Sequence, residues 1–190
     1  MRTGGGKAKG SGFERKICEM LSLWVSGGRH KDLFWRSAIS GGRSTVGLKK
    51  GKDLRYQAGD ICAVGPEGHS LIDKFYIECK FYNKIAIDQF ALENRGQVLA
   101  WWRLACKHAK AFGREPMMIV KQNRGQILVI NRPNALTTTG IMGYDAPMRV
   151  DVVGPDPCEI RLFSVLLRST YQGAQPRLEK RDERTIRKIR

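Results

Sequence analysis

The sequence has few acidic residues, few histidines and no cysteine pair. Its 18 aspartates and glutamates face 34 lysines and arginines, which gives a formal net charge of +16. The three histidines, His30, His69 and His108, lack metal-ligand spacing, and we give none of them a catalytic role. The five cysteines are odd in number and scattered among apolar residues without a Cys-x-x-Cys pair. They are therefore expected to be buried thiols in a reducing compartment, not disulfides or zinc ligands.

Long apolar segments are also missing. The chain has no membrane-spanning run, no signal-peptide core and no lipidation motif, which disfavours an anionic membrane as its partner. We therefore expect a soluble, intracellular protein in the cytoplasm of a bacterial host or other prokaryote. The large positive charge predicts a polyanionic partner, with nucleic acid as the first candidate.

The domain organisation is simple, because we find no internal repeat and no linker within the 190 residues. Residues 1–10, which include three successive glycines and two lysines, are expected to form a flexible basic arm. Residues 11–175 suit a single folded domain, and residues 176–190 a charged tail.

Apolar residues at helical spacing predict two helices. The first begins with Ser11 as N-cap and ends at Gly27-Gly28, with Phe13, Ile17, Leu21 and Trp24 on one face. Glu14 falls in its first turn, where a carboxylate suits the helix dipole, or else it leans into an active site.

The second predicted helix covers residues 97–113. Its expected buried stripe includes Leu104, Ala105, His108 and Phe112, which places Gln97 at its N-terminal end. The adjacent residues Trp101 and Trp102 cannot point the same way on a helix, so one of them should face outward or towards a partner.

Shorter apolar runs predict strands at residues 33–39, 116–121, 126–130 and 148–153. Residues 85–94 fit either a loop or a short helix, residues 132–147 are mostly loop, and residues 158–171 fit a strand or a helix. An early helix, a three-stranded meander and a crossover helix indicate an α/β fold with a central mixed β-sheet flanked by helices.

The stretch from Asp60 to Lys80 carries the chemistry. Two strand-like segments flank the turn residues 65–68, and alternation along the second strand places Glu78 and Lys80 on one face. If the strands pair near these residues, Asp60 adds a second carboxylate, and the site could hold magnesium or manganese. The alternative is an ordinary solvated Glu-x-Lys ion pair.

A basic segment precedes this stretch. It is either a disordered connector or a clamp that orders on DNA, and the concentration of positive charge favours the clamp. The expected DNA-binding residues are one arginine of the preceding strand, Arg36, and five residues of the basic segment: Arg43, Lys49, Lys50, Lys52 and Arg55.

Together these residues resemble the PD-(D/E)XK nuclease superfamily, with its restriction-endonuclease-like core. The resemblance covers about residues 11–130 and is carried by Glu14, Gly59-Asp60, Glu78-Cys79-Lys80 and Gln97. Within the superfamily, small size, basic charge and helix-first order are similar to phage and archaeal Holliday-junction resolvases. One departure is that Ala58-Gly59 stands where the family has a proline before the first aspartate.

The resemblance implies a metal site. Asp60 and Glu78 would ligate magnesium with the backbone carbonyl of Cys79, and Glu14 would bind a second metal directly or through water. Lys80 would position the attacking water and stabilise transition-state charge, and Gln97 would orient Lys80 or the phosphate. A lysine in such a carboxylate-rich site stays protonated and acts as an electrostatic group.

The expected activity is magnesium-dependent DNA endonuclease action, with branched DNA as the expected substrate. A resolvase cuts two opposed strands, so this hypothesis predicts a homodimer. A sequence-specific restriction-type endonuclease shares the same chemistry. A non-catalytic nucleic-acid-binding module explains the positive charge equally well, but it gives no reason for carboxylates to converge.

Overall fold

The computed structural model describes residues 5–37, 57–141, 150–154 and 156–172. The first helix, α1 (Gly5–Val25), buries the predicted stripe of Phe13, Ile17, Leu21 and Trp24. It begins at Gly5, however, and not at Ser11, so part of the segment expected to be a flexible arm is helical. Glu14 therefore lies inside the helix, and its predicted place in the first turn is wrong.

A small two-stranded sheet follows α1. Strands β1 (Phe34–Arg36) and β2 (Ile61–Ala63) pair antiparallel, with Trp35 opposite Cys62. The predicted turn after β2 is instead the start of helix α3 (Pro66–Ile72). Pro66 occupies the first turn, where proline suits a helix, and Leu71 and Ile72 are buried.

The main sheet has five strands in the order β3-β4-β5-β7-β6. Its strands are β3 (Phe75–Tyr82), β4 (Glu115–Gln122), β5 (Ile127–Asn131), β6 (Val150–Val152) and β7 (Cys158–Leu162). β3 and β4 are parallel, whereas the other neighbouring pairs are antiparallel. The predicted mixed sheet is confirmed, but the predicted meander is not, since β1 and β2 form a sheet of their own.

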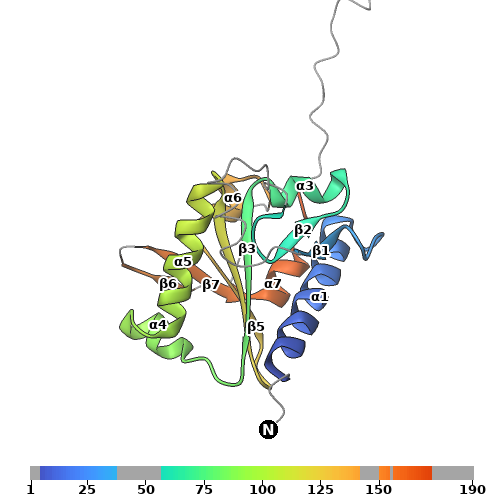
Figure 1. The fold of residues 1–190 in the computed structure, drawn as a ribbon. Coiled ribbons are helices and arrows are strands. Elements are labelled where there is room, and N and C mark those ends of the chain that lie inside the picture. Colours follow the sequence, from blue (N-terminus) through green and yellow to red (C-terminus); the bar gives the residue numbers. More distant parts are fainter. Residues whose placement is uncertain (1–4, 38–56, 142–149, 155, 173–190) are drawn as a thin grey trace, which may run out of the picture.

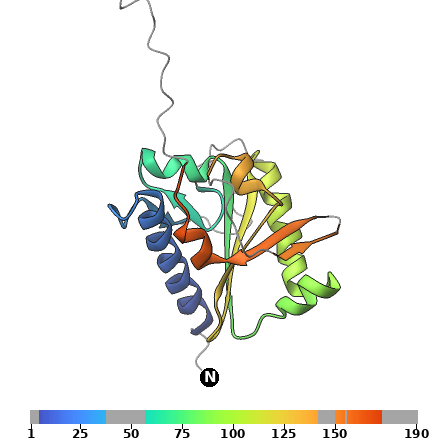
Figure 2. The same cartoon turned by 180° about the vertical axis from the view of Figure 1, so that it is seen from behind.

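Helices cover both faces of this sheet. In Figure 1, α4 (Ile87–Glu93) and α5 (Gln97–Ala111) lie on one side of β3, and α1 and α7 (Phe163–Arg168) lie on the other. The view from behind in Figure 2 shows the same two layers of helices on either side of the sheet. Each layer has its own apolar core, one between α1 and the sheet and one between α5 and the sheet.

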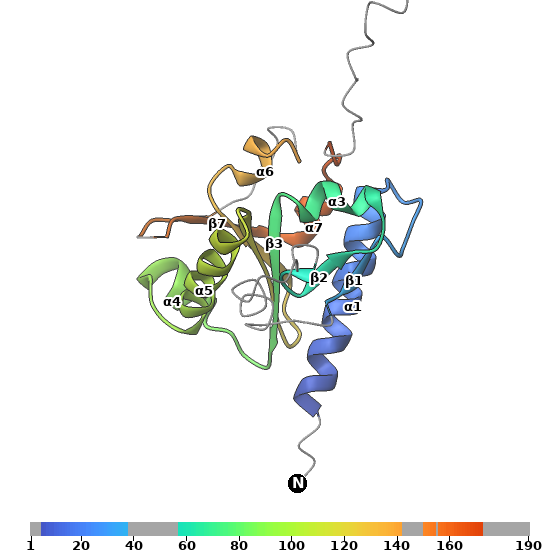
Figure 3. The ribbon, with the colours of Figure 1, turned by 45° about the horizontal axis from the view of Figure 1, so that its top comes forward.

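The structure also decides the segments for which the sequence left two possibilities. Residues 85–94 contain the helix α4, and residues 158–171 contain both the strand β7 and the helix α7. The predicted loop after β5 includes a short helix, α6 (Ala135–Thr138), which Figure 3 shows beyond the end of the sheet. Within the described residues, no helix combines the length and apolar character needed to cross a membrane.

Helix α5 confirms the expected difference between its two tryptophans. Trp102 is fully buried and donates its Nε1 hydrogen to the backbone oxygen of Asp156 at 2.9 Å, whereas Trp101 is half-buried. The predicted stripe is wrong at Leu104, which is 49% exposed. The buried face is rotated towards Val98, Leu99, Trp102, Ala105, Cys106 and Ala109. All five cysteines are free thiols; Cys62 is half-buried and the other four are buried.

Candidate active site

Asp60 joins the small sheet to the outermost strand, β3, of the large one. Its backbone N–H donates to the oxygen of Ile77 at 2.8 Å, and its backbone oxygen accepts from Ser37 at 2.8 Å. Its side-chain Oδ2 accepts a hydrogen bond from the backbone N–H of Cys79 at 2.8 Å. Since β3 is the outermost strand of the five-stranded sheet, these bonds fix a buried carboxylate at the sheet edge.

Gly59 makes this approach possible. Its φ is +85°, and a Cβ at this position would lie 2.5 Å from the backbone oxygen of Ile77. Proline is restricted to φ near about −65°, so it cannot adopt this conformation. The departure from the family pattern at Gly59 is therefore part of the way in which this chain brings Asp60 against β3.

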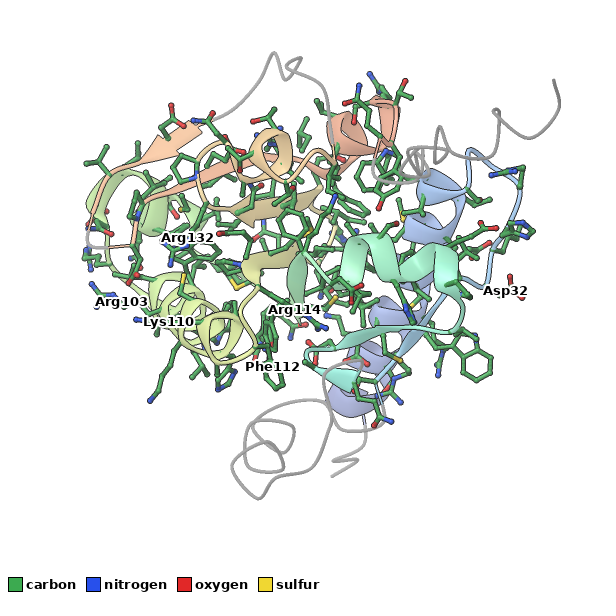
Figure 4. All side chains as sticks on the ribbon, turned by 90° about the horizontal axis from the view of Figure 1, so that it is seen from above. Asp32, Arg103, Lys110, Phe112, Arg114 and Arg132 are labelled. Carbon is green, nitrogen blue, oxygen red and sulfur yellow. The ribbon has the colours of Figure 1, made fainter. Side chains whose placement is uncertain are left out.

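Glu78 and Lys80 lie on the face of β3 that is turned towards α5. On the same face, the ring centroid of Tyr76 lies 6.0 Å from that of Phe112, and the ring centroid of Tyr82 lies 4.6 Å from that of Trp101. Figure 4, seen from above, labels Phe112 on the side of α5 that faces the small sheet.

The charged side chains of this face pair directly. Lys80 Nζ donates to Glu78 Oε1, and both side chains are largely buried, so the expectation of a solvated ion pair does not describe them. Glu78 Oε2 is buried and accepts no hydrogen bond of ordinary geometry from the residues that the structure describes. The Tyr76 hydroxyl is a nearby polar group on this face, and its interaction with Glu78 contributes, after burial, to the raised pKa of Tyr76.

The electrostatics of Asp60 and Lys80 follow from burial and proximity. Burial, and then the nearby charge of Glu78, raise the pKa of Asp60 to about 7, although the Cys79 N–H and Lys80 oppose this shift. Burial lowers the pKa of Lys80, but the Glu78 carboxylate outweighs it and the net shift is upward. Lys80 therefore remains a cation at neutral pH.

The oxygen atoms at this edge suit a hard divalent ion. The N–H and C=O of a strand residue point the same way, so the carbonyl of Cys79 faces the edge where Asp60 lies. Two neighbouring buried carboxylates, one of which has a pKa raised by burial and by the other's charge, fit magnesium or manganese. In the described part of the chain, no three His, Cys, Asp or Glu side chains gather closely enough to hold a metal.

Glu14 lies close to this arrangement, and Gln97 lies at the start of α5. Glu14 Oε2 accepts a hydrogen bond from Arg36 Nε at 2.8 Å, and its charge contributes to the raised pKa of Asp60. Gln97 is exposed and is the first residue of α5, as predicted. Its predicted role in orienting Lys80 stays a prediction. The expected DNA-binding residues Arg43, Lys49, Lys50, Lys52 and Arg55 lie outside the described residues.

A comparison with protein families decides the wider identity. The family described as "phage putative PDDEXK endonuclease" matches residues 5–154, a range that includes Glu14, Asp60, Glu78, Lys80 and Gln97. The chain belongs to this family. No curated protein and no solved structure matches it. Membership in a PDDEXK endonuclease family agrees with the resemblance to the PD-(D/E)XK superfamily.

The chain also has a basic residue whose fixed position near the candidate site the sequence did not reveal. Lys9 Nζ donates to Asn83 Oδ1 at 2.9 Å and to Asn123 Oδ1, and it lies 4.1 Å from the centroid of the Phe81 ring. Lys9 belonged to the segment expected to be a flexible arm, where no local pattern indicated a fixed position. The sequence analysis also did not single out Tyr82 as a neighbour of the candidate site, although its spacing of two from Lys80 placed it on the same strand face.

Proposed function

We propose that the protein is a magnesium-dependent endodeoxyribonuclease that hydrolyses phosphodiester bonds in branched DNA, such as Holliday junctions. One observation carries the proposal: Asp60 and Glu78 are buried together beside the cation Lys80, at the edge of a sheet, in a chain of net charge +16. Clustered carboxylates repel phosphate unless a metal ion intervenes, so a nuclease accounts for acidic groups in this basic protein and a simple binder does not.

The proposed ligands are Asp60, Glu78 and the carbonyl of Cys79, with Glu14 next to them. A divalent ion held there would supply Lewis-acid chemistry, polarising the scissile phosphate and easing the ionisation of a water molecule. The backbone contacts of Asp60 orient its carboxylate before substrate arrives. Such preorganisation lowers the cost of reaching the transition state.

Lys80 supplies positive charge from the protein itself. Because its pKa is raised, Lys80 donates hydrogen bonds and does not remove a proton. It would orient the attacking water and stabilise the negative charge that develops on the phosphate oxygens. Gln97 would orient Lys80 or the phosphate from the start of α5.

DNA would reach the site through the basic residues. Arg36, which is paired with Glu14, lies on β1 near the site, and the basic residues of the segment 38–56 follow it in the sequence. We propose that these side chains contact the phosphate backbone. Cutting two opposed strands of a junction requires two active sites, so we also propose a homodimer.

The first experiment is cleavage of labelled four-way junction, splayed-arm and linear duplex DNA with magnesium, with manganese and with EDTA. The wild type is compared with Glu78→Ala, with the isosteric Glu78→Gln, and with Glu67→Gln, which alters an exposed glutamate of α3. We expect metal-dependent, symmetric nicks on the junction that persist in Glu67→Gln and vanish in both Glu78 variants, while DNA binding remains.

Two other outcomes point elsewhere. Nicks at one sequence of the linear duplex would identify a restriction-type endonuclease with the same chemistry. Tight DNA binding without cleavage under any metal condition, unchanged in Glu78→Ala, would overturn the enzyme assignment and leave a basic nucleic-acid-binding protein. Sedimentation equilibrium with and without the junction tests the dimer separately.

A further inference from the structure

A pocket of about 430 Å³ lies next to Lys80, along the edge of β3 beyond Cys79. It is bordered by Lys9 and Gly10 of α1 on one side and by residues 79–83 on the other. Because Lys80 belongs to both the pocket and the candidate active site, an occupant of the pocket would lie beside the reacting phosphate.

The pocket presents positive charge. Lys9 is held in place by neutral groups, the two asparagine side chains and the Phe81 ring, which leave its charge uncompensated by these contacts. None of the residues that border the pocket is acidic. These features suit a phosphate group, which is the anion that a positioned lysine binds as a point charge.

The pocket also has an aromatic wall. Tyr82 is 42% exposed, and its ring stacks on Trp101 with an interplanar angle of 30°. Trp101 belongs to α5, and the next residue of this helix, Trp102, is fully buried. The helix that carries the Trp101 ring behind Tyr82 is therefore anchored to the core. Tyr82 lies on the α5 face of β3, whereas Lys9 packs on Phe81 of the α1 face, so the pocket reaches around the edge of the strand. An exposed aromatic ring on one side and a fixed cation on the other suit single-stranded nucleic acid.

We infer that this pocket binds an unpaired nucleotide next to the scissile phosphate, with the base stacked on Tyr82 and its phosphate held by Lys9. The inference rests on the proposed nuclease function and deepens it by naming the form of DNA selected. A base within a continuous duplex has both faces covered by its neighbours, so a protein ring is reached only by a base that has left the stack. Such bases occur where strands separate at a branch.

The test uses one cleavage sequence in three forms. The forms are a continuous duplex, a splayed arm with an unpaired nucleotide next to the scissile bond, and the same splayed arm with an abasic residue at that position. We expect the wild type with magnesium to prefer the splayed arm over the duplex, and Tyr82→Ala to lower this preference by about tenfold. Tyr82→Phe, which keeps the ring, should retain it.

Two controls separate stacking from a general loss of folding or of aromatic surface. Trp35→Ala removes an aromatic side chain that is 63% exposed on β1 and does not border the pocket, and it should keep the preference. The abasic substrate should be cut more slowly than the normal splayed arm by the wild type, but not by Tyr82→Ala. Equal cleavage of the two splayed arms by the wild type would overturn the pocket proposal and leave the nuclease standing.

A binding measurement keeps the inference testable if no cleavage is found. Stacking of a base on Tyr82 should quench the fluorescence of Trp101 when oligothymidylate is added in EDTA, and Trp101→Phe should abolish this change. Lys9→Ala should weaken the binding and reduce the slope of log affinity against log salt by about 0.7. An unchanged affinity in both Lys9→Ala and Tyr82→Ala, with intact thermal unfolding, would overturn the inference.

Discussion

Two strands of the main sheet carry the same local pattern, a glutamate followed two residues later by a cation. Glu78 and Lys80 pair on β3, and Glu159 and Arg161 pair on β7. Both glutamates are buried. Within each pair, the glutamate and the cation lie on the same face of their strand. The pattern alone therefore does not distinguish an active site from a structural ion pair.

Their surroundings differ. Glu159 lies on β7, between β5 and β6, where its Oε1 accepts from Asn131 at 2.6 Å and its Oε2 from the backbone of Asn134 at 3.5 Å. Glu78 lies on an edge strand beside Asp60, with one oxygen that lacks an ordinary hydrogen bond. Glu159 also faces a carboxylate, that of Asp151 opposite it on β6, but Asp151 is exposed whereas Asp60 is buried. A buried second carboxylate beside an edge strand thus distinguishes the candidate site from the pair on β7.

Removing the cation from each pair should give the sharpest contrast. We expect Arg161→Met to lower the free energy of unfolding by about 3–5 kcal/mol, because it leaves Glu159 buried without its cation. We expect Lys80→Met to lower the cleavage rate by about 10²–10³-fold through lost charge stabilisation. Its loss of stability should be smaller than that of Arg161→Met, because the Lys80 side chain is 22% exposed and that of Arg161 only 4%. Denaturant unfolding and single-turnover cleavage measure the two effects, and equal losses of stability would contradict the distinction.

The pH dependence of the free energy of unfolding should reveal the contribution of Asp60, beside the pair on β3, in the metal-free protein. A pKa of Asp60 raised from 3.8 to about 7 means that its contribution to stability is complete below its unfolded pKa and is lost as pH rises through about 7. We expect the free energy of unfolding to fall by up to about 4 kcal/mol from this group between acidic and mildly alkaline pH. Asp60→Asn should remove this fall; the measurement is urea unfolding in EDTA over the pH range. An identical profile in wild type and variant would contradict the assignment.

The backbone that brings Asp60 to β3 should be sensitive to a single methyl group. Gly59→Ala places a Cβ against the backbone of Ile77 at a positive φ, so we expect a loss of about 2 kcal/mol in stability and impaired cleavage. Gly12→Ala is the matched control, since a Cβ there meets no atom within 4 Å and the position is helical. It should gain about 0.5–1 kcal/mol in thermal or chemical unfolding. Equal tolerance of both substitutions would show that the close approach at Gly59 is not needed.

Exchanging the two cations should produce the smallest effects. Arg161→Lys loses the planar fork of the guanidinium in a buried site, and we expect a destabilisation of about 1 kcal/mol. Lys80→Arg keeps the charge but spreads it over a larger group, and we expect cleavage to slow by about tenfold. Chemical unfolding and cleavage rates, measured for both variants, give the comparison. Full activity in Lys80→Arg would mean that the position requires only a positive charge.

Sequence reasoning succeeded where a local pattern reported the structure. The periodicity of Phe13, Ile17, Leu21 and Trp24 identified the buried face of α1, and charged residues within an apolar strand identified Glu78 and Lys80. The mixed sheet followed from the order of these elements. The assignment of metal-binding and catalytic roles remains a prediction.

It failed where the deciding contacts are distant or ambiguous. The glycine and proline that open α3 also suit a turn, and this seven-residue helix is too short to show a clear period. Lys9 is fixed by Asn83 and Asn123, which are 74 and 114 residues away in the sequence. No local pattern could have indicated those partners.

The backbone amide of Cys79 donates a hydrogen bond to Asp60 Oδ2. Asp60 is therefore both a candidate metal ligand and a hydrogen-bond partner of the β3 backbone. Exchange of this amide proton with solvent requires that bond to open, so its rate reports on the position of one carboxylate. In a spectrum that resolves Cys79, a single backbone resonance would follow the state of the site without any label. It would respond to ions, DNA and pH in the intact protein, including under conditions where no DNA is cut.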